Sequence, residues 1–393
     1  MSGAPVDRFV AKVGEALAGA PKPVQLHEPD LDDSDAEAVA ACVRSGWVSS
    51  AGPQIGEFES AIAARIRLPH AVAVASGTAA LQLALTVAGV VPGDEVLVPS
   101  ITFVATANSV AHCGAVPHFV DCEPETLGID PERLRAWLGG IAVADGSALR
   151  NRATGRRIAA MVPVHVFGLP ARIEALGEVA AAFGLPMIED ATEALGSSSR
   201  GRPCGGFGVA GVLSFNGNKI VTTGGGGAVV SGDPRFAARV RHLATTAKAR
   251  HAWRFDHDEV AWNYRMPNLN AALGLSQLRR FDALFAAKSA LAARYARVFA
   301  ECDLAVPLRP RADTVSNYWL ASVALTGALG GALDECLTAL HAAGYMCRPL
   351  WTPLHELQPY RTAPRAPLPV SEDFARRVVS LPSTARLGAG GTA

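Results

Sequence analysis

One lysine in this sequence stands where an amine could do chemistry. The 36 basic residues include only five lysines, at positions 12, 22, 219, 248 and 288, so the other 31 are arginines. Lys219 follows an apolar run that ends at Phe215, and glycines 224–227 come soon after it. An amine at a strand end, among apolar and small neighbours, loses its proton easily and attacks carbonyl carbons. This pattern indicates a Schiff-base lysine for pyridoxal phosphate, although a solvated lysine beside a glycine turn has the same local sequence.

A carboxylate that could serve the same cofactor ends another apolar stretch. Asp190 closes the run of residues 186–190, which lies upstream of Lys219. A carboxylate in a partly buried cleft needs a cationic partner, and the protonated ring nitrogen of pyridoxal phosphate is one. A helix N-cap for residues 191–193 is an equally good interpretation of Asp190.

Further polar and aromatic residues follow predicted strands. Ser76, Gly77 and Thr78 stand between a strand and a helix, where free amides and hydroxyls bind anions, but also where an ordinary N-cap occurs. Phe103 could stack on an aromatic ring or belong to the core. His165 could reach the same cleft or be a hydrogen-bonded core histidine.

The order of the elements predicts an α/β protein. Short apolar strands alternate with helices from residue 71 to 230, which favours a mainly parallel sheet covered on both faces. Polar residues cluster after these strands, where open α/β sheets bind ligands. From residue 234 the pattern is mostly helical, and a C-terminal segment has strands of its own, residues 317–323 among them. The predicted division is an N-terminal segment (1–58) that packs with the small domain, a large domain (59–285) and a small domain (286–393).

Composition narrows the class of function. Hydrophobic residues make up 49% and charged residues 18%, with a formal net charge of zero, so no basic surplus points to nucleic acid. The apolar runs are too short to span a membrane. The seven cysteines lack metal-site spacing and indicate reduced thiols of a cytoplasmic protein, and the histidines show no metal-binding motif. We therefore expect no metal, no membrane and no nucleic-acid partner.

Taken together, the motifs resemble the DegT/DnrJ/EryC1/StrS family of pyridoxal-phosphate sugar aminotransferases. The likeness runs from about residue 24 to 381 and includes the segments 46–59, 76–81, 99–108, 189–196, 214–227 and 263–277. It implies the type I (aspartate aminotransferase) fold, with a large domain built on a mainly parallel seven-stranded sheet and a smaller C-terminal α/β domain. The fit is specific because several motifs occur in the same order at compatible spacing.

The resemblance also implies a role for each matching residue. Lys219 would hold pyridoxal phosphate as a Schiff base, Asp190 would hold the ring nitrogen and Phe103 would stack on the ring. The cofactor phosphate would be bound by the following residues: Gly77, Thr78, Ser214 and, from the other subunit of a homodimer, Asn263. Asn263 and Arg265 lie in one polar segment, residues 262–267, before a predicted helix. This segment could contact the phosphate or be only a structured loop.

Position 193 departs from the family pattern. The family commonly has Gln or His near the cofactor's 3-hydroxyl, and this chain has Glu193. A negative charge beside a phenolate-like oxygen is unfavourable unless a proton is shared. Candidate substrate contacts are Trp47, His165, Arg348 and Trp351.

The resemblance is strongest to the LegC-like subgroup. It implies transfer of an amino group from glutamate to a UDP-linked 4-keto-6-deoxy-N-acetylhexosamine, at C4. Alternatives are another ketosugar linked to dTDP or GDP and aminated at C3 or C4, a sugar dehydratase, or a non-catalytic cofactor-binding regulator. The dehydratases of this fold replace the lysine with His, so Lys219 argues against that alternative. A regulator would be expected to lack Lys219 or Asp190, and the chain has both.

Overall fold

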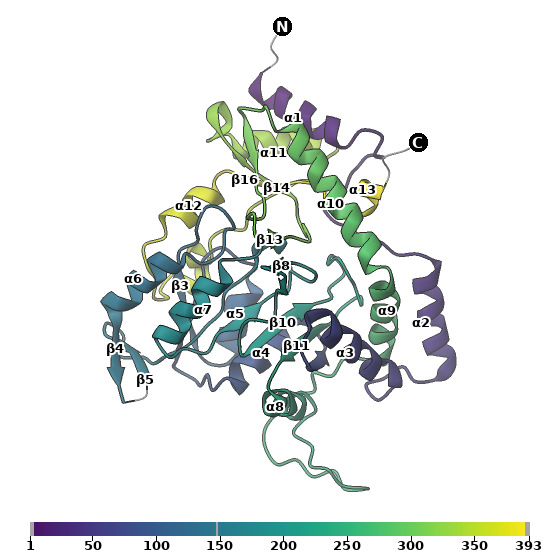
Figure 1. Ribbon diagram of the computed structural model, residues 1–393, viewed down its shortest axis with the longest axis vertical. Helices are drawn as coiled ribbons and strands as arrows, with labels where there is room; N and C mark the ends of the chain where they lie inside the picture. Colours follow the sequence, from purple (N-terminus) through teal and green to yellow (C-terminus); the bar gives the residue numbers. More distant parts are fainter. Residues whose placement is uncertain (1–3, 147, 390–393) are drawn as a thin grey trace.

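The computed structural model describes residues 4–146 and 148–389 (Figure 1). A layered α/β part occupies the lower half of the view, and a smaller part with its own sheet lies above it. The long helix α10 (Phe281–Val298) runs between them. The predicted boundary at residue 285 falls inside this helix, and the proposed division into domains stays a prediction.

The large part is built on seven strands. Their order across the sheet is β1 (His70–Val74), β11 (Gly227–Ser231), β10 (Ala210–Ser214), β7 (Ile188–Asp190), β6 (Ile158–Met161), β2 (Glu95–Pro99) and β3 (Val116–Val120). The four-stranded and three-stranded halves meet through parallel bridges between Met161 and Met187 and between Val164 and Asp190. Every neighbouring pair is parallel except the two that involve β11. The mainly parallel seven-stranded sheet expected from the sequence is therefore present.

Helices cover both faces of this sheet, which explains why its strands are nearly continuous apolar runs. Alternate strand residues point to opposite faces: Val72 and Val74 pack under one helix layer, and Ala71 and Ala73 under the other. The first layer contains α4 (Gly77–Val87), α5 (Ala105–His112) and α8 (Pro234–Ala244). The second layer contains α3 (Pro53–Ile66), α6 (Pro131–Ile141), α7 (Ile173–Ala182) and α9 (Asn268–Arg279).

The smaller part has an antiparallel sheet with a helical cover. Its strands are, in spatial order, β12 (Ala305–Pro307), β14 (Ser322–Leu325), β16 (Val378–Ser380) and β15 (Arg348–Pro349). Its helices are α1 (Pro5–Ala16), α11 (Leu333–Ala342) and the short α13 (Arg386–Ala389) beside α10. Phe9 and Val13 of α1 pack with Tyr295 and Phe299 in one apolar cluster. By contrast α2 (Asp33–Ser45) packs against α9 of the large part.

Shorter elements complete the chain. They are the hairpin β4 (Ala142–Asp145) and β5 (Ala148–Asn151), the small sheet β8 (Ser198–Ser199), β9 (Arg202–Pro203) and β13 (Thr314–Val315), and helix α12 (Pro369–Ala375). The strand predicted at residues 317–323 begins only at Ser322, and residues 316–321 form a hydrogen-bonded loop instead. Among the described helices none is long and apolar enough to cross a membrane.

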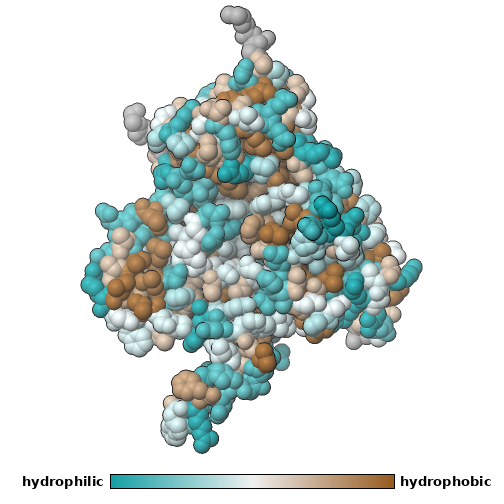
Figure 2. Space-filling view, turned by 180° about the vertical axis from the view of Figure 1, so that it is seen from behind, coloured by the Kyte–Doolittle hydropathy of each residue, from teal (hydrophilic) through white to brown (hydrophobic). Residues whose placement is uncertain are grey.

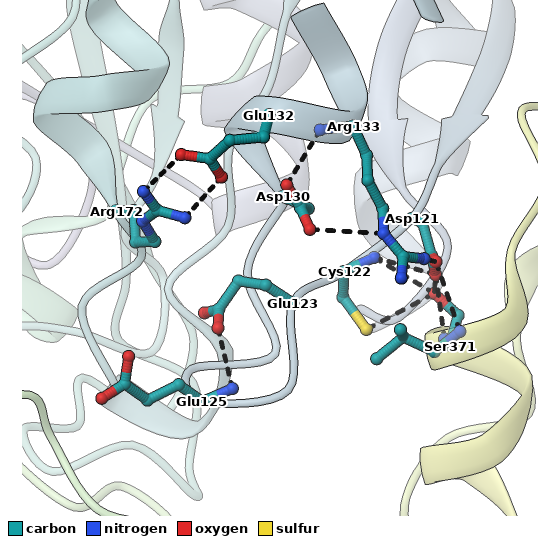
Figure 3. Close-up of polar contacts among 10 residues, drawn as sticks. Asp121, Cys122, Glu123, Glu125, Asp130, Glu132, Arg133, Arg172 and Ser371 are labelled. Atoms are coloured by element: carbon teal, nitrogen blue, oxygen red, sulfur yellow. Dashed lines mark hydrogen bonds and ion pairs between the residues drawn. The ribbon is translucent and has the colours of Figure 1, made fainter. Parts of the chain in front are cut away.

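One carboxylate joins the end of β3 to α12 (Figure 3). Asp121 Oδ1 accepts hydrogen bonds from the Ser371 amide at 2.9 Å and the Ser371 hydroxyl at 2.7 Å. Its Oδ2 accepts from Arg133 at 2.5 Å and from the Val370 amide at 3.2 Å. The first amides of a helix have no partner within the helix, so Asp121 satisfies two of them and fixes the C-terminal segment to the large sheet.

Candidate active site

Lys219 lies in the turn between the antiparallel strands β10 and β11. Its amide donates to the Asn216 carbonyl at 3.0 Å, which closes the turn. Its Nζ lies 3.8 Å from Glu193 Oε1 and 3.7 Å from the centre of the Trp319 ring. Burial lowers the pKa of the Lys219 amine, and the neighbouring Glu193 and Asp190 carboxylates oppose this shift. An amine in such a place is a good nucleophile.

Asp190 stands at the carboxyl end of β7 and is only 4% exposed. Its Oδ2 accepts from the Thr106 hydroxyl at 2.8 Å. Its Oδ1 accepts from the Thr192 hydroxyl at 2.7 Å and the Thr192 amide at 3.2 Å. These bonds hold the carboxylate in one orientation. A carboxylate that pairs with a cationic ring nitrogen needs such a fixed orientation.

The N-terminus of α4 forms a cradle for an anion. Ser76 is the N-cap, and its hydroxyl accepts from the Ala79 amide at 3.1 Å. Gly77 lets the chain pass close to Ser214, because a Cβ at position 77 would lie 3.0 Å from the Ser214 Cβ. Gly227 of β11 packs still more tightly, since its Cβ would lie 2.5 Å from the Ser76 carbonyl carbon. Free amides and the helix dipole at such an end favour a phosphate.

These residues surround one cavity of about 310 Å³. It is lined by Ser76, Gly77, Thr78, Leu81, Phe103, Ala105, Thr106, Ser109, Asp190, Thr192, Glu193, Ser214, Asn216, Asn218, Lys219, Gly225, Gly226 and Trp319. The structure thus brings together the predicted residues from the sheet: Gly77, Thr78, Phe103, Asp190, Glu193, Ser214 and Lys219. The cavity lies at the carboxyl ends of β7 and β10, where α/β sheets place their ligands.

Glu193 is the unusual member of this cavity. It is 3% exposed, and its Oε2 accepts from the Phe167 amide at 2.8 Å. Burial raises the pKa of the Glu193 carboxyl to about 7, with Lys219 opposing the rise and Asp190 adding to it. The group therefore holds a proton more readily than an ordinary glutamate, which is the condition for placing it beside a phenolate-like oxygen.

Sequence reasoning gave no role in the cavity to Thr106, Thr192 or Trp319. Thr106 of α5 and Thr192 of the turn after β7 hold Asp190. Their hydroxyls gave no signal, because threonine hydroxyls have many other local hydrogen-bonding uses. Trp319 comes from the loop before β14, and its Nε1 donates to the Asn218 carbonyl at 2.6 Å. No spacing in the sequence connects Trp319 with Lys219, because only the tertiary fold brings the two segments together.

Two predicted residues lie away from the cavity. His165 is fully buried, with Nε2 at 3.1 Å from Glu189 and Nδ1 accepting from the Ala171 amide at 3.1 Å. Both ring nitrogens are thus used inside the core, and His165 does not reach the cleft. Asn263 is exposed and accepts from Arg265 Nε at 3.3 Å.

The other candidate substrate residues are also outside the cavity lining. Trp47 is exposed, and its carbonyl accepts from Asn268 Nδ2 at 2.7 Å. Arg348 is exposed beside the Cys347 carbonyl. The ring centre of Trp351 lies 6.5 Å from that of Phe103, which lines the cavity.

Three side chains with potential metal-ligand atoms, His242, Asp258 and Glu259, lie together outside the cavity. His242 Nε2 is 2.7 Å from Asp258 Oδ1 and 3.5 Å from Glu259 Oε1. The Glu259 carboxylate is already paired with Arg239, with Nη2 at 2.7 Å from Oε2. The expectation of an enzyme without a metal stays a prediction.

The cavity residues fit pyridoxal phosphate. The anion cradle suits its phosphate, and the oriented carboxylate suits its ring nitrogen. The amine of lowered pKa suits its aldehyde. A cavity of this volume is of the size that holds a small cofactor. The role of each individual residue toward the cofactor stays a prediction.

Comparisons with known proteins agree with this fit. GDP-perosamine synthase of Caulobacter vibrioides is 36% identical over 365 residues, which are 93% of this chain and 94% of that protein. GDP-perosamine synthase of Vibrio cholerae is 34% identical over 364 residues, which are 92% and 94% of the two chains. The structure of Spr1654 from Streptococcus pneumoniae in its PLP form matches with a TM-score of 0.81 at 26% identity, over 92% of this chain and 93% of that one.

The family match covers nearly the whole chain. The description "DegT/DnrJ/EryC1/StrS aminotransferase family" applies to residues 29–391. With the structural match, it confirms the expected fold and pyridoxal phosphate as the cofactor. The LegC-like subgroup within this family stays a prediction. The chain therefore belongs to the DegT/DnrJ/EryC1/StrS aminotransferase family.

Proposed function

We propose that this protein transfers an amino group from glutamate to a nucleotide-linked ketosugar. The observation that carries the proposal is the single cavity in which Lys219, Asp190 and the α4 N-terminus converge. Bound pyridoxal phosphate supplies an electron-withdrawing ring that can carry an amino group between two substrates. The family match and the two perosamine synthases support the sugar aminotransferase reaction.

The geometry of the cavity supports the role that we propose for each residue. The α4 amides of Gly77 and Thr78, with the Ser214 hydroxyl, bind the phosphate. Asp190 keeps the ring nitrogen protonated. Lys219 attaches the cofactor covalently and, once free, moves a proton to and from the substrate carbon as base and acid. Burial lowers the pKa of this amine, which favours the neutral form that the task needs.

The nucleotide is proposed to be GDP. Both relatives described above are named GDP-perosamine synthase and align over more than nine-tenths of this chain. These names favour a GDP-linked substrate over the UDP-linked sugar that the LegC-like resemblance implies. The UDP- and dTDP-linked ketosugars become the other arms of the test.

The test is a panel of purified ketosugar nucleotides. GDP-, UDP- and dTDP-linked sugars with a 3-keto or a 4-keto group are each incubated with glutamate. Products are identified by mass, and 2-oxoglutarate is measured in parallel. We expect one nucleotide class to be aminated with equal release of 2-oxoglutarate, and the GDP-linked class to be fastest. A faster UDP-linked substrate would overturn the choice of nucleotide, and no amination of any member would contradict the proposed reaction.

We further propose a homodimer with shared active sites. Residues 246–262 form an arm that projects beyond α8 (Figure 1), and Figure 2 shows brown hydrophobic residues on it. Trp253, Phe255 and Val260 are 77%, 76% and 97% exposed. Large apolar side chains gathered on a projecting segment are typical of an interface with another chain. Asn263 stands at the base of this arm, where it could reach a neighbouring subunit's phosphate.

A further inference from the structure

A second lysine is buried close to the cavity and takes no part in the proposed reaction. Lys288 of α10 is 2% exposed. Its Nζ donates to the Ser383 carbonyl at 2.5 Å and the Trp319 carbonyl at 3.2 Å, and lies 2.9 Å from His27 Nε2. An ammonium group has three N–H donors and no acceptor. The three neighbours of Lys288 therefore use every donor that it has.

The state of His27 fits a charged Lys288. Burial and the positive charge of Lys288 keep the pKa of His27 well below its usual value, so the ring is neutral. Its Nε2 then accepts the hydrogen bond from Lys288, and its proton sits on Nδ1. Among the described residues, this buried Nδ1 finds no partner. Burial also lowers the pKa of Lys288, to about 7, so the ammonium form with its three donors predominates below neutral pH.

The three partners belong to segments far apart in the sequence. His27 precedes α2, Trp319 lies in the loop before β14, and Ser383 follows β16. The Ser383 hydroxyl also accepts from the Ala321 amide at 2.8 Å, in the same loop as Trp319. Lys288 thus hydrogen-bonds to the segments around His27 and Ser383 and also to the loop of residues 316–321.

This loop needs such fastening because its backbone is strained. Tyr318 has a φ of 47°, in the left-handed region that residues with a side chain rarely adopt. A strained residue persists only where its surroundings hold it in place. The Asn317 side chain accepts from the Trp319 amide at 2.9 Å, and Lys288 binds the carbonyl of the same residue. The main chain of Trp319 is therefore held on both its amide and its carbonyl.

The side chain of Trp319, whose main chain is held in this way, contacts Lys219. Its ring centre lies 3.7 Å from Lys219 Nζ, and its Nε1 donates to the carbonyl of Asn218, the residue before the lysine. A cation over an indole face is stabilised by the negative face of the ring. The charged groups that shift the pKa of Lys219 are Glu193 and Asp190, and neither contacts Lys288 directly.

We propose that Lys288 is a positioning residue, whose ammonium group fixes the Trp319 main chain and thereby holds the indole ring against the Lys219 amine. Its importance for transamination rests on the proposed role of Lys219. The contacts from Lys288 to Trp319 and from Trp319 to Lys219 do not depend on that role, because they form between residues of the chain without the cofactor.

The test measures the ionisation of Lys219 in the full-length, cofactor-free protein. The rate of amine labelling at each lysine is followed against pH by mass spectrometry of peptides. The variants are Lys288→Met, Trp319→Leu and the double variant, and Lys12→Met is the matched control on the surface helix α1. Labelling at Lys22 serves as an internal reference in every sample, because it would reveal a general loosening of the fold.

The direction of the shift separates the proposal from a simple charge effect. Removing a nearby positive charge raises the pKa of an amine, whereas losing the indole contact lowers it. We expect Lys288→Met and Trp319→Leu each to lower the pKa of Lys219 by about half a unit to one unit. The double variant should show no further fall, because both changes remove the same contact. Lys12→Met should leave the value unchanged.

Several outcomes would overturn the proposal. An unchanged or raised pKa of Lys219 in Lys288→Met would do so, as would two shifts that add in the double variant. If Lys288→Met does not fold, Lys288→Gln replaces it: the amide keeps polar contacts that help folding, but it lacks the ammonium group, so the same fall in the pKa of Lys219 is expected. Failure of both to fold while Lys12→Met folds would assign Lys288 to the fold as a whole and contradict the proposal. Borohydride labelling of Lys219 by pyridoxal phosphate, measured separately, shows whether the role of Lys219 itself stands.

Discussion

Glu193 Oε1 lies 3.8 Å from Lys219 Nζ, in a cavity where the Glu193 side chain is buried and the Lys219 side chain is 12% exposed. The pKa of the carboxyl is raised to about 7 and that of the amine is lowered, in each case mainly by burial. The two shifts bring the pKa values of the carboxyl and the amine closer together, which is an arrangement suited to proton transfer.

Glu193 should make the protein less stable as the pH rises. Its pKa is about 7 in the folded chain and near 4.5 when unfolded, so the unfolded state loses its proton first. The stability that the protonated group contributes is complete below pH 4.5 and is lost as the pH rises toward 7. The Glu193→Gln variant should escape this loss, which amounts to at most about 3 kcal/mol. Urea unfolding of both proteins between pH 4.5 and 8 measures the difference, and parallel curves would contradict the shifted pKa.

Lys219 should carry the cofactor covalently. Borohydride reduction of the loaded protein should leave pyridoxal phosphate on the peptide that contains Lys219. The Lys219→Ala variant should lose transamination by several orders of magnitude, because both the attachment and the proton carrier are removed. Lys12→Ala, at another of the five lysines and outside the proposed interface, is the control and should remain active. Label on Lys248 or Lys288 instead would assign the attachment elsewhere.

Asp190→Asn should keep the fold but bind the cofactor weakly and turn over slowly. An amide does not stabilise a protonated ring nitrogen, so we expect turnover to fall by about a hundredfold or more. Thr106→Val removes only one hydrogen bond to the carboxylate and should cost about tenfold. Steady-state kinetics on both variants gives the comparison. Nearly unchanged turnover of Asp190→Asn would mean that another residue holds the nitrogen.

Shared sites predict that two inactive variants can restore each other. Lys219→Ala and Asn263→Ala are mixed, unfolded and reassociated, and each alone serves as the control. A heterodimer then has both lesions in one site and none in the other, so part of the activity should return. If heterodimers form without any recovery, and Asn263→Ala is inactive alone, Asn263 serves the site of its own chain. If Asn263→Ala is active, Arg265 is the next residue to test.

Asp121 should contribute strongly to stability. Asp121→Asn weakens the bonds to the α12 amides and the Arg133 guanidinium, and it leaves buried groups less well satisfied. We expect a loss of about 1–3 kcal/mol in the free energy of unfolding. Glu125→Gln is a control, because the Glu125 side chain is exposed and makes only a distant contact with Arg311. Equal stability of the two variants in urea would show that Asp121 does not fasten the C-terminal segment.

The sequence predicted the parts of the site that lie on regular elements. A strand ending near Asp190 and another ending before Lys219 were expected, because apolar runs bounded by polar residues indicate buried strands. The same pattern carries no information on direction, so the antiparallel setting of β11 was not foreseen. Trp319 could not be predicted as a wall of the cavity, since it depends on a strained loop in the other part of the chain. Likewise, the apolar setting of His165 left two alternatives that only its bonds to Glu189 and Ala171 could separate.

The close packing of Gly227 against the Ser76 carbonyl has a consequence for how the site keeps its dimensions. The anion cradle and the lysine turn are far apart in the sequence. They meet where the main chain of Gly227 packs directly against the main chain of Ser76. Such a contact works through repulsion between atoms, so neither salt nor acidity can adjust it. The N-terminus of α4 is therefore held at one distance from the start of β11, whatever the salt concentration or the pH.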